Sequence, residues 1–285
     1  MRRFGAQSMT APLRDVLLRA PDDAFGAAFD NPAHGFRHAV DLPEAKRQHA
    51  ALCSLLTALG VTVHLHEEEG LGPDSIYTFD PLLVLDRGAL PLRSGKPTRL
   101  GEEKALEAWT RAAGIPTVGR IAEPGTVDGG DTFWLRPDVF CVGRSLRTNR
   151  AGAAQLASML DGQVEIFDMP VWRGAAEVLH LLSVISPVAD DLAVVFPPLL
   201  PAGLHELLAD LGVRKLAVEQ DEFETLGCNV LAVRPGVVVL AEGNRRIATA
   251  MALAGCEVHT FAASEIGLNG SGGPTCLTRP IWRET

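Results

Sequence analysis

Residues 230–259 read VLAVRPGVVVLAEGNRRIATAMALAGCEVH, and this stretch alternates strand-like with helix-like segments. Two apolar runs rich in β-branched residues, 230–233 and 237–240, predict short strands. The residues that follow predict a helix over about 244–254 and then a further strand at 257–259. Because short strands and helices alternate in this way from one end of the chain to the other, we expect an α/β fold.

The rest of the chain repeats this alternation. Further strands are predicted at residues 61–65, 82–85, 139–142, 164–167, 192–195 and 215–218, and further helices at about 42–59, 101–113, 150–161 and 202–212. In the clearest helix, 42–59, Asp41 is a potential N-terminal cap, Glu44 stands three residues later and Gly60 follows the last apolar position. A unit of one helix with two or three strands recurs about every 50 to 60 residues, which suggests a repeat architecture.

The composition is that of a soluble globular protein, because 47% of the 285 residues are hydrophobic and 21% are charged. A net charge of −9 disfavours binding to nucleic acid, and no apolar run reaches the roughly 18 to 20 residues of a membrane span. The N-terminus lacks the apolar segment of a secretory signal, so we expect a cytoplasmic protein. No linker divides the chain, so we expect one domain over residues 11–285 after a disordered lead-in at 1–10.

Cys276 lies in the stretch NGSGGPTCLT, near the end of the chain. The glycines and the proline before it let the backbone turn sharply and approach a ligand closely, so the thiol is a candidate nucleophile. A buried thiol in a C-terminal strand fits the same stretch equally well. The five cysteines show no CxxC spacing, which argues against a disulfide framework and a zinc site, and we expect neither a metal nor a cofactor.

Two loops carry paired acids. The stretch EPGTVDGGDT contains Asp128 and Asp131, and the stretch GPDSIYTFDP contains Asp74 and Asp80 on either side of the only tyrosine. These acids either face a binding site or cap their own turns. His180 lies in the apolar, strand-like run EVLHLLS, where it is either catalytic or a core histidine with its hydrogen bonds satisfied.

Two arginines stand beside predicted helix starts or turns. Arg147 lies in GRSLRTN, just before the potential helix cap Asn149, and Arg99 lies in GKPTR. A guanidinium group suits bidentate capture of a carboxylate. Either arginine can instead be solvated.

The order of these motifs along the chain resembles one family. The motifs are PDSxxxxDP, RxGxPxR, GTxDGGD, GxSxRTN, VLHL and GGxxCL, and they span roughly residues 60–280. Their order resembles that of the dimethylarginine dimethylaminohydrolase family, which belongs with arginine deiminases and amidinotransferases to the guanidine-modifying pentein group. The resemblance implies a single-domain, pseudo-fivefold α/β propeller of five ββαβ-type units around a central active-site channel.

The resemblance also implies roles for individual residues. Cys276 is the expected nucleophile, His180 the general acid and base, and Asp128 the carboxylate that orients His180 or holds the guanidinium group. The expected substrate contacts are Asp80 at the guanidinium group, Asp74 at the polar end, and Arg99 and Arg147 at the α-carboxylate.

These residue types suit the hydrolysis of a guanidinium group. Its carbon is a poor electrophile, so the reaction needs a strong nucleophile such as a thiolate, while carboxylates hold the cation in place. We therefore expect Cys276 to form a covalent S-alkylthiouronium intermediate with a guanidino or ureido amino acid. The first candidate substrate is asymmetric dimethylarginine, which would give citrulline and an amine.

Two positions depart from the family and leave the substrate open. Phe79 replaces an acid that the family usually carries before Asp80, and we expect its ring to contact N-methyl groups or a longer alkyl chain. Leu182 stands where arginine deiminases carry an acid, which disfavours a deiminase. The alternatives are a hydrolase of another arginine derivative or of citrulline, and a non-catalytic pentein that binds a partner. We expect no nucleic-acid or membrane partner, and an exposed propeller edge is compatible with a homodimer.

Overall fold

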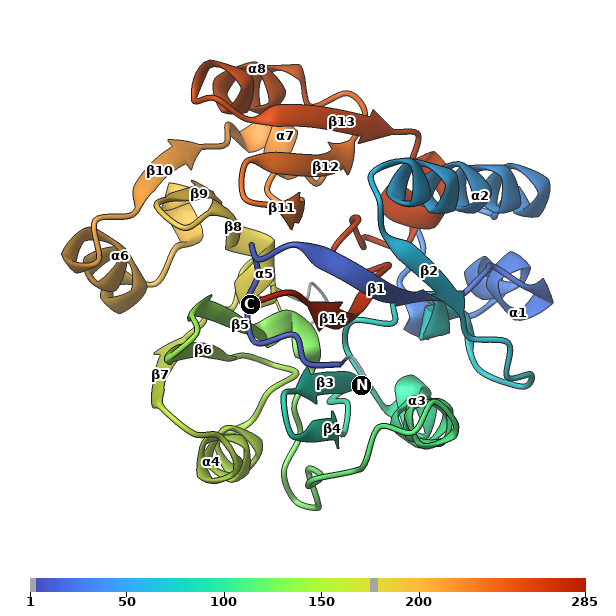
Figure 1. Cartoon of the computed structure of the whole chain (residues 1–285). Helices are drawn as coiled ribbons and strands as arrows, with labels where there is room; N and C mark the ends of the chain where they lie inside the picture. Colours follow the sequence, from blue (N-terminus) through green and yellow to red (C-terminus); the bar gives the residue numbers. More distant parts are fainter. Residues whose placement is uncertain (1–3, 175–178) are drawn as a thin grey trace.

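Five small β-sheets stand in a ring around the centre of the molecule, with the longer helices on the outside (Figure 1). The computed structural model describes residues 4–174 and 179–285. Four of the sheets have three strands and one has two. The ring arrangement follows from one local pattern that the chain repeats.

That pattern is an antiparallel pair of strands followed by a helix and a third strand parallel to the second. It appears in β5 (Thr132–Arg136), β6 (Val139–Arg144), α4 (Arg150–Met159) and β7 (Gln163–Asp168). It recurs in β8 (Ile185–Ala189), β9 (Leu192–Val195), α6 (Ala202–Asp210) and β10 (Arg214–Ala217). The third instance consists of β11 (Leu231–Arg234), β12 (Val237–Ala241), α8 (Arg245–Leu253) and β13 (Glu257–Phe261).

The two ends of the chain close the ring together. The C-terminal strand β14 (Arg279–Arg283) pairs antiparallel with β1 (Leu13–Leu18), and α2 (Leu42–Ala58) leads to β2 (Thr62–Leu65), which is parallel to β1. The fifth unit contains β3 (Leu82–Leu85), β4 (Gly88–Pro91) and α3 (Glu102–Ala112), and its third strand is reduced to a single bridge between Ala89 and Thr117. The predicted α/β propeller of ββαβ-type units is confirmed.

The predicted helices agree with the structure to within about two residues at each end. In α2 the side chain of Asp41 accepts a hydrogen bond from the Glu44 amide at 3.0 Å, as the capping pattern predicts. Gly60 follows the helix with φ 86°, in the left-handed region that favours glycine. Leu52 and Leu56 are fully buried, so this helix covers its sheet with the predicted apolar stripe.

Five strands were absent from the sequence-based expectation: β1, β4, β5, β8 and β14. The strand β14 shows why, because it carries two arginines that suggest an exposed segment but are 3% and 2% exposed. Arg279 donates to the Phe79 carbonyl at 2.7 Å and Arg283 donates to the Ala232 carbonyl at 2.8 Å. Backbone oxygens thus accept hydrogen bonds from both buried guanidinium groups, although the Nε of each has no hydrogen-bond partner among the described residues.

Two further expectations differ from the structure. Residues 4–10 are not a loose lead-in, since the Gly5 amide donates to the Ile281 carbonyl and the Ala6 amide donates to the Val84 carbonyl, both at 2.9 Å. Residues 1–3 lie outside the described residues. His180 does not lie in a strand but directly before the short helix α5 (Leu181–Val184), and positions 177 and 178 of that run also lie outside the described residues.

The short helices α1 (Asp23–Gly26) and α7 (Gln220–Phe223) complete the described elements that Figure 1 labels. Within residues 4–174 and 179–285, no helix has the length and the apolar character that a membrane span requires.

Candidate active site

A cavity of about 650 Å³ brings most of the predicted site residues together. It is lined by six of the eight: Asp74, Asp80, Arg99, Arg147, His180 and Cys276. Asp128 is completely buried and contacts two of these lining residues from behind the cavity wall. The acids, the histidine and the thiol are spread over about 200 positions of the sequence, from Asp74 to Cys276. They become neighbours only in the folded ring.

The two carboxylate oxygens of Asp128 differ in their hydrogen bonds. Its Oδ1 accepts hydrogen bonds from the Ser94 hydroxyl at 2.7 Å and the Gly95 amide at 3.0 Å. Its Oδ2 lies 3.5 Å from His180 Nε2 and 3.5 Å from Arg147 Nη1. These are ion-pair distances rather than short hydrogen bonds, and neither Oδ2 nor Nε2 has a hydrogen-bond partner among the described residues.

The glycine pair after Asp128 lets His180 come close. A side chain at Gly130 would place its Cβ 2.5 Å from His180 Nδ1, and one at Gly129 would place it 2.3 Å from the Phe79 carbonyl oxygen. The Gly130 amide donates to Asp80 Oδ1 at 2.8 Å. The pair therefore joins the two acidic loops beneath the imidazole.

His180 is a cation at neutral pH in this arrangement. Burial alone lowers its pKa, but the charges of Asp131, Asp128 and Asp80 and the contact with Asp128 outweigh burial and raise the pKa of His180 to about 9. The same contact with His180, aided by Arg99 and Arg147, outweighs the burial of Asp128 and holds the pKa of Asp128 below its usual range.

Asp131 is a further candidate site residue, which our role assignment omitted. It is completely buried, its Oδ1 accepts from the Leu181 amide at 3.1 Å and its Oδ2 accepts from the Ser145 hydroxyl at 2.6 Å. Burial raises its pKa to about 6, although the charge of His180 opposes this shift. Asp131 therefore anchors the start of α5 and, when ionised, favours the imidazolium form of His180. Its place in GTxDGGD, three residues after Asp128, is the signal by which the sequence marks it.

The Cys276 thiol lines the cavity and has one side-chain hydrogen-bond partner. Asn229 Nδ2 donates to Cys276 Sγ at 3.2 Å, and Asn229 Oδ1 accepts from the Thr275 amide at 3.1 Å. Burial and the nearby charge of Asp80 raise the pKa of Cys276 to about 12, while the hydrogen bond from Asn229 lowers it. The Cys276 thiol is therefore protonated at neutral pH. No pattern in the sequence singled out Asn229.

The glycines before Cys276 make room for protein side chains. A Cβ at Gly270 or Gly272 would meet the Tyr77 side chain at 2.0 and 2.3 Å, and a Cβ at Gly273 would meet the Asn229 side chain at 2.5 Å. Gly270 and Gly272 also line the cavity. The close approach that the sequence predicted exists, but the groups that approach are Tyr77 and Asn229.

Arg99 is committed within the protein rather than presented to a ligand. It is 4% exposed, forms an ion pair with Asp80, and forms a second one with Glu102 at 2.7 Å. Its Nη2 also donates to the Tyr77 carbonyl at 3.0 Å. The structure therefore places Arg99 behind Asp80, which differs from our expectation of a clamp on an α-carboxylate.

Phe79 also lies elsewhere than expected. Its side chain is 3% exposed in the hydrophobic core, and the Arg279 guanidinium stacks 3.7 Å above the ring centroid. Phe79 is not among the residues that line the cavity. The expected contact of this ring with substrate N-methyl groups is therefore wrong, because the ring forms a cation–π pair with a buried arginine instead.

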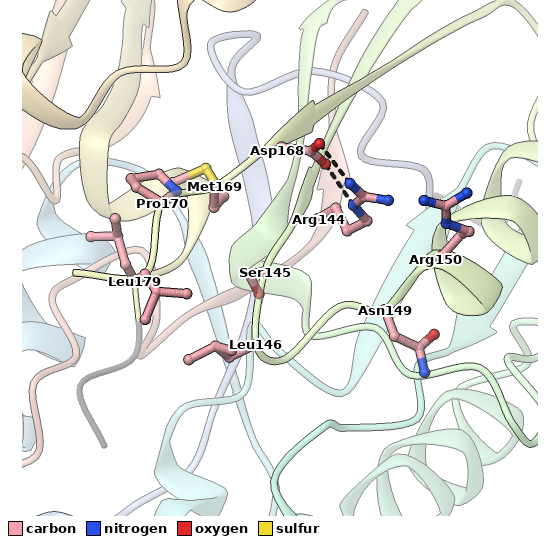
Figure 2. Close-up of a pocket in the computed structure, with 10 residues that line it drawn as sticks. Arg144, Ser145, Leu146, Asn149, Arg150, Asp168, Met169, Pro170 and Leu179 are labelled. Carbon is pink, nitrogen blue, oxygen red and sulfur yellow. Dashed lines mark hydrogen bonds and ion pairs between the residues drawn. The ribbon is translucent and has the colours of Figure 1, made fainter. Parts of the chain in front are cut away.

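A second cavity, of about 360 Å³, shares Leu179 with the first (Figure 2). One side of it carries the bidentate ion pair of Arg144 and Asp168, with nitrogen to oxygen distances of 2.5 and 2.6 Å. It has neither a thiol nor a histidine in its lining. The candidate active site is therefore the larger cavity.

Comparison with known proteins identifies the family of this chain. The family model described as arginine deiminase matches residues 75–211 and 206–283. An N(G),N(G)-dimethylarginine dimethylaminohydrolase of Streptomyces coelicolor is 30% identical over 259 residues, which cover 78% of this chain and 97% of the relative. An arginine deiminase of Mycobacterium avium is 32% identical over 190 residues, but only 46% of that relative is matched.

Solved structures show the same fold. The dimethylarginine dimethylaminohydrolase of Pseudomonas aeruginosa, solved with citrulline as a cysteine variant, matches 95% of this chain with a TM-score of 0.77 and 23% identity. The N-terminal domain of the cyanobacterial arginine dihydrolase ArgZ matches 94% of this chain with a TM-score of 0.82 and 20% identity. This chain therefore belongs to the family that unites dimethylarginine dimethylaminohydrolases with arginine deiminases, and it is a hydrolase of the C–N bonds of amidino groups.

Proposed function

We propose that this chain hydrolyses the guanidino group of an arginine-like carboxylic acid through a covalent intermediate on Cys276. The observation that carries the proposal is that the Cys276 thiol, the His180 imidazolium and the Asp80 carboxylate line one cavity, with Asp128 in contact with His180 from behind its wall, although they come from distant parts of the chain. Cys276 serves as the nucleophile, His180 as the general acid and base, and Asp128 and Asp80 hold the guanidinium cation.

The first step is activation of the thiol by the substrate. With a pKa of about 12, Cys276 is protonated in the empty site, and His180, with a pKa of about 9, is already cationic and does not accept the proton. A guanidinium group bound between Asp80 and Asp128 places a positive charge beside Sγ and lowers the pKa of the thiol, so the proton leaves to solvent.

The covalent step follows from that charge arrangement. The thiolate forms a bond to the guanidinium carbon, and the His180 imidazolium donates its proton to the departing nitrogen as the C–N bond breaks. A neutral amine leaves, and a planar S-alkylthiouronium cation remains on Cys276.

Hydrolysis regenerates both groups. Neutral His180 takes a proton from a water molecule as the water oxygen bonds to the thiouronium carbon. The C–S bond then breaks as the remaining hydroxyl proton passes to the sulfur, which releases the Cys276 thiol and a neutral ureido product. Asp128, 3.5 Å from Nε2, keeps the imidazole directed at the reacting atoms in both steps. N-methylated arginine is the first candidate substrate, since the relative from Streptomyces coelicolor is a dimethylarginine dimethylaminohydrolase; the products would be citrulline and an amine.

The test is a turnover assay with asymmetric dimethylarginine, monomethylarginine, arginine, des-amino arginine and citrulline. We expect a ureido product and a released amine or ammonia from at least one guanidino compound, and no product from the Cys276→Ser variant. Absence of product from every guanidino compound would contradict the proposal.

A further inference from the structure

The wall of the cavity already contains an ammonium group, that of Lys96. Its Nζ donates to Asp74 Oδ1 at 2.9 Å, to Asp74 Oδ2 at 2.8 Å and to the His34 carbonyl at 2.9 Å. A lysine ammonium has three hydrogens, and here each has an acceptor. Lys96 and Asp74 both line the cavity, yet their side chains are only 11% and 8% exposed.

The Asp74 carboxylate, which would accept hydrogen bonds from a ligand ammonium, is therefore already hydrogen-bonded to Lys96. Both oxygens of Asp74 receive Lys96, and Oδ2 also lies 3.3 Å from His34 Nδ1. A second ammonium beside Asp74 would gain the attraction of one carboxylate and meet the repulsion of Lys96 at a similar distance, while losing its own hydration.

The surroundings of this ion pair are positive. Burial is the largest cause that lowers the pKa of Lys96, Arg147 and Arg99 lower it further, and Asp74 opposes them. The cations near Lys96 thus already disfavour its own charge, and a ligand ammonium would add to the same repulsion.

A carboxylate, by contrast, finds donors that are free. The Arg147 guanidinium lines the cavity with one ion-pair contact, at 3.5 Å to Asp128, and makes no hydrogen bond within residues 4–174 and 179–285. Arg37 lines the cavity with a hydrogen bond to the Ser271 hydroxyl at 3.4 Å and has no carboxylate within ion-pair distance in the same ranges. Each of these guanidinium groups thus has unused donors that suit a ligand carboxylate.

We propose that Lys96 occupies the ammonium subsite at Asp74, so that the cavity selects guanidino carboxylic acids without a free α-ammonium group. This substrate class rests on the hydrolase function proposed above, and within that function it puts acids without an α-ammonium ahead of N-methylated arginine. Des-amino arginine (5-guanidinopentanoate) and Nα-acylated arginines fit the class. Arginine carries an additional ammonium that has no acceptor, and agmatine lacks the carboxylate.

The test is calorimetric binding to the full chain with Cys276→Ser, which removes turnover. The ligands are 5-guanidinopentanoate and arginine, which differ only in the α-ammonium, together with Nα-acetylarginine and agmatine. We expect 5-guanidinopentanoate to bind at least about tenfold more tightly than arginine, with Nα-acetylarginine above arginine and agmatine weakest. Arginine binding as tightly as 5-guanidinopentanoate would overturn the inference.

Lys96→Met in the same background tests the residue itself. Freeing Asp74 should reduce the preference for 5-guanidinopentanoate over arginine by about tenfold or more. Lys104→Met is the matched control, since Lys104 is exposed on α3 and its loss changes the net charge equally; it should leave the preference unchanged. An unchanged preference in Lys96→Met would remove Lys96 as the determinant. If that variant does not fold, the ligand series without it still decides.

The two proposals fail in different ways. If arginine or its methylated forms bind and turn over better than 5-guanidinopentanoate, only the substrate class is wrong and methylated arginine remains the substrate. If no guanidino compound binds or reacts, the hydrolase proposal fails and this inference fails with it.

Discussion

Two carboxylates at the cavity, those of Asp128 and Asp74, have different partners. At the reacting end, Asp128 Oδ2 lies 3.5 Å from both His180 and Arg147 and has no hydrogen-bond partner among the described residues. In the ion pair of Asp74 and Lys96, by contrast, both oxygens of Asp74 lie within 2.9 Å of the Lys96 ammonium. The Oδ2 atom of Asp128 therefore keeps an unused acceptor beside His180 and Arg147, whereas both oxygens of Asp74 are already satisfied by a lysine.

The sharpest way to break this comparison is to neutralise each acid in turn. Asp128→Asn should lower kcat by about 10²- to 10⁴-fold, because His180 loses its orienting charge and the guanidinium group loses one anion. Asp74→Asn should leave kcat nearly unchanged and alter KM alone. Steady-state kinetics with the best substrate measures kcat and KM of both variants. Equal losses in kcat would show that the two carboxylates do not differ in role.

The next effect concerns the pH dependence of the reacting end. His180 must be protonated when the amine departs, and its pKa is raised to about 9, so kcat/KM should fall as the pH rises through about 9. Asp131→Asn removes the charge that raises this pKa most, so the fall should begin closer to pH 6.5. A pH–rate profile of both proteins tests this shift. An unchanged alkaline limb would contradict the role of Asp131.

Asn229 provides a smaller effect at the same end. Asn229→Ala removes the side-chain donor to Sγ, so the pKa of Cys276 should rise and alkylation by iodoacetamide should slow by about tenfold at a fixed alkaline pH. Cys53, part-buried on α2, serves as the internal control, and its rate should not change. Mass spectrometry of the labelled peptides reads both rates, and equal labelling of Cys276 in the two proteins would exclude this positioning role.

The smallest effect is expected at Phe79. Because its ring packs under Arg279 and not in the cavity, Phe79→Glu should place the new carboxylate beside that guanidinium and leave the Kd of guanidino ligands unchanged. Calorimetry on the Cys276→Ser background measures this. Tighter binding of arginine-type ligands would mean that position 79 reaches the cavity after all.

Much of the fold could be predicted from local patterns, and the exceptions are physically instructive. The helix at 42–59 carries a cap, an apolar stripe and a terminal glycine, which are all local signals. The strand β14 carries no such local signal, because the burial of Arg279 and Arg283 depends on backbone carbonyls from distant segments. A composition pattern cannot indicate such partners.

The candidate site also contains residues that local motifs predict and residues whose roles depend on distant partners. Ordered motifs predicted Cys276, His180 and Asp128 as site residues, and the structure places Cys276 and His180 in the lining of one cavity with Asp128 in contact with His180. The roles of Lys96 and Asn229 depend on contacts with residues 22 and 47 positions away in the sequence, and their own neighbours in the sequence carry no sign of these contacts. Phe79 was assigned to the substrate by analogy with the acid it replaces, but an aromatic side chain lowers its free energy by entering the core.

The most direct measurement is acid-quench mass spectrometry of the protein during turnover of a guanidino substrate. The account predicts an adduct of the amidino carbon on the peptide that contains Cys276, formed and lost at the rate of turnover and absent in Cys276→Ser. Formation of ureido product with no adduct on this peptide, together with activity retained in Cys276→Ser, would contradict it.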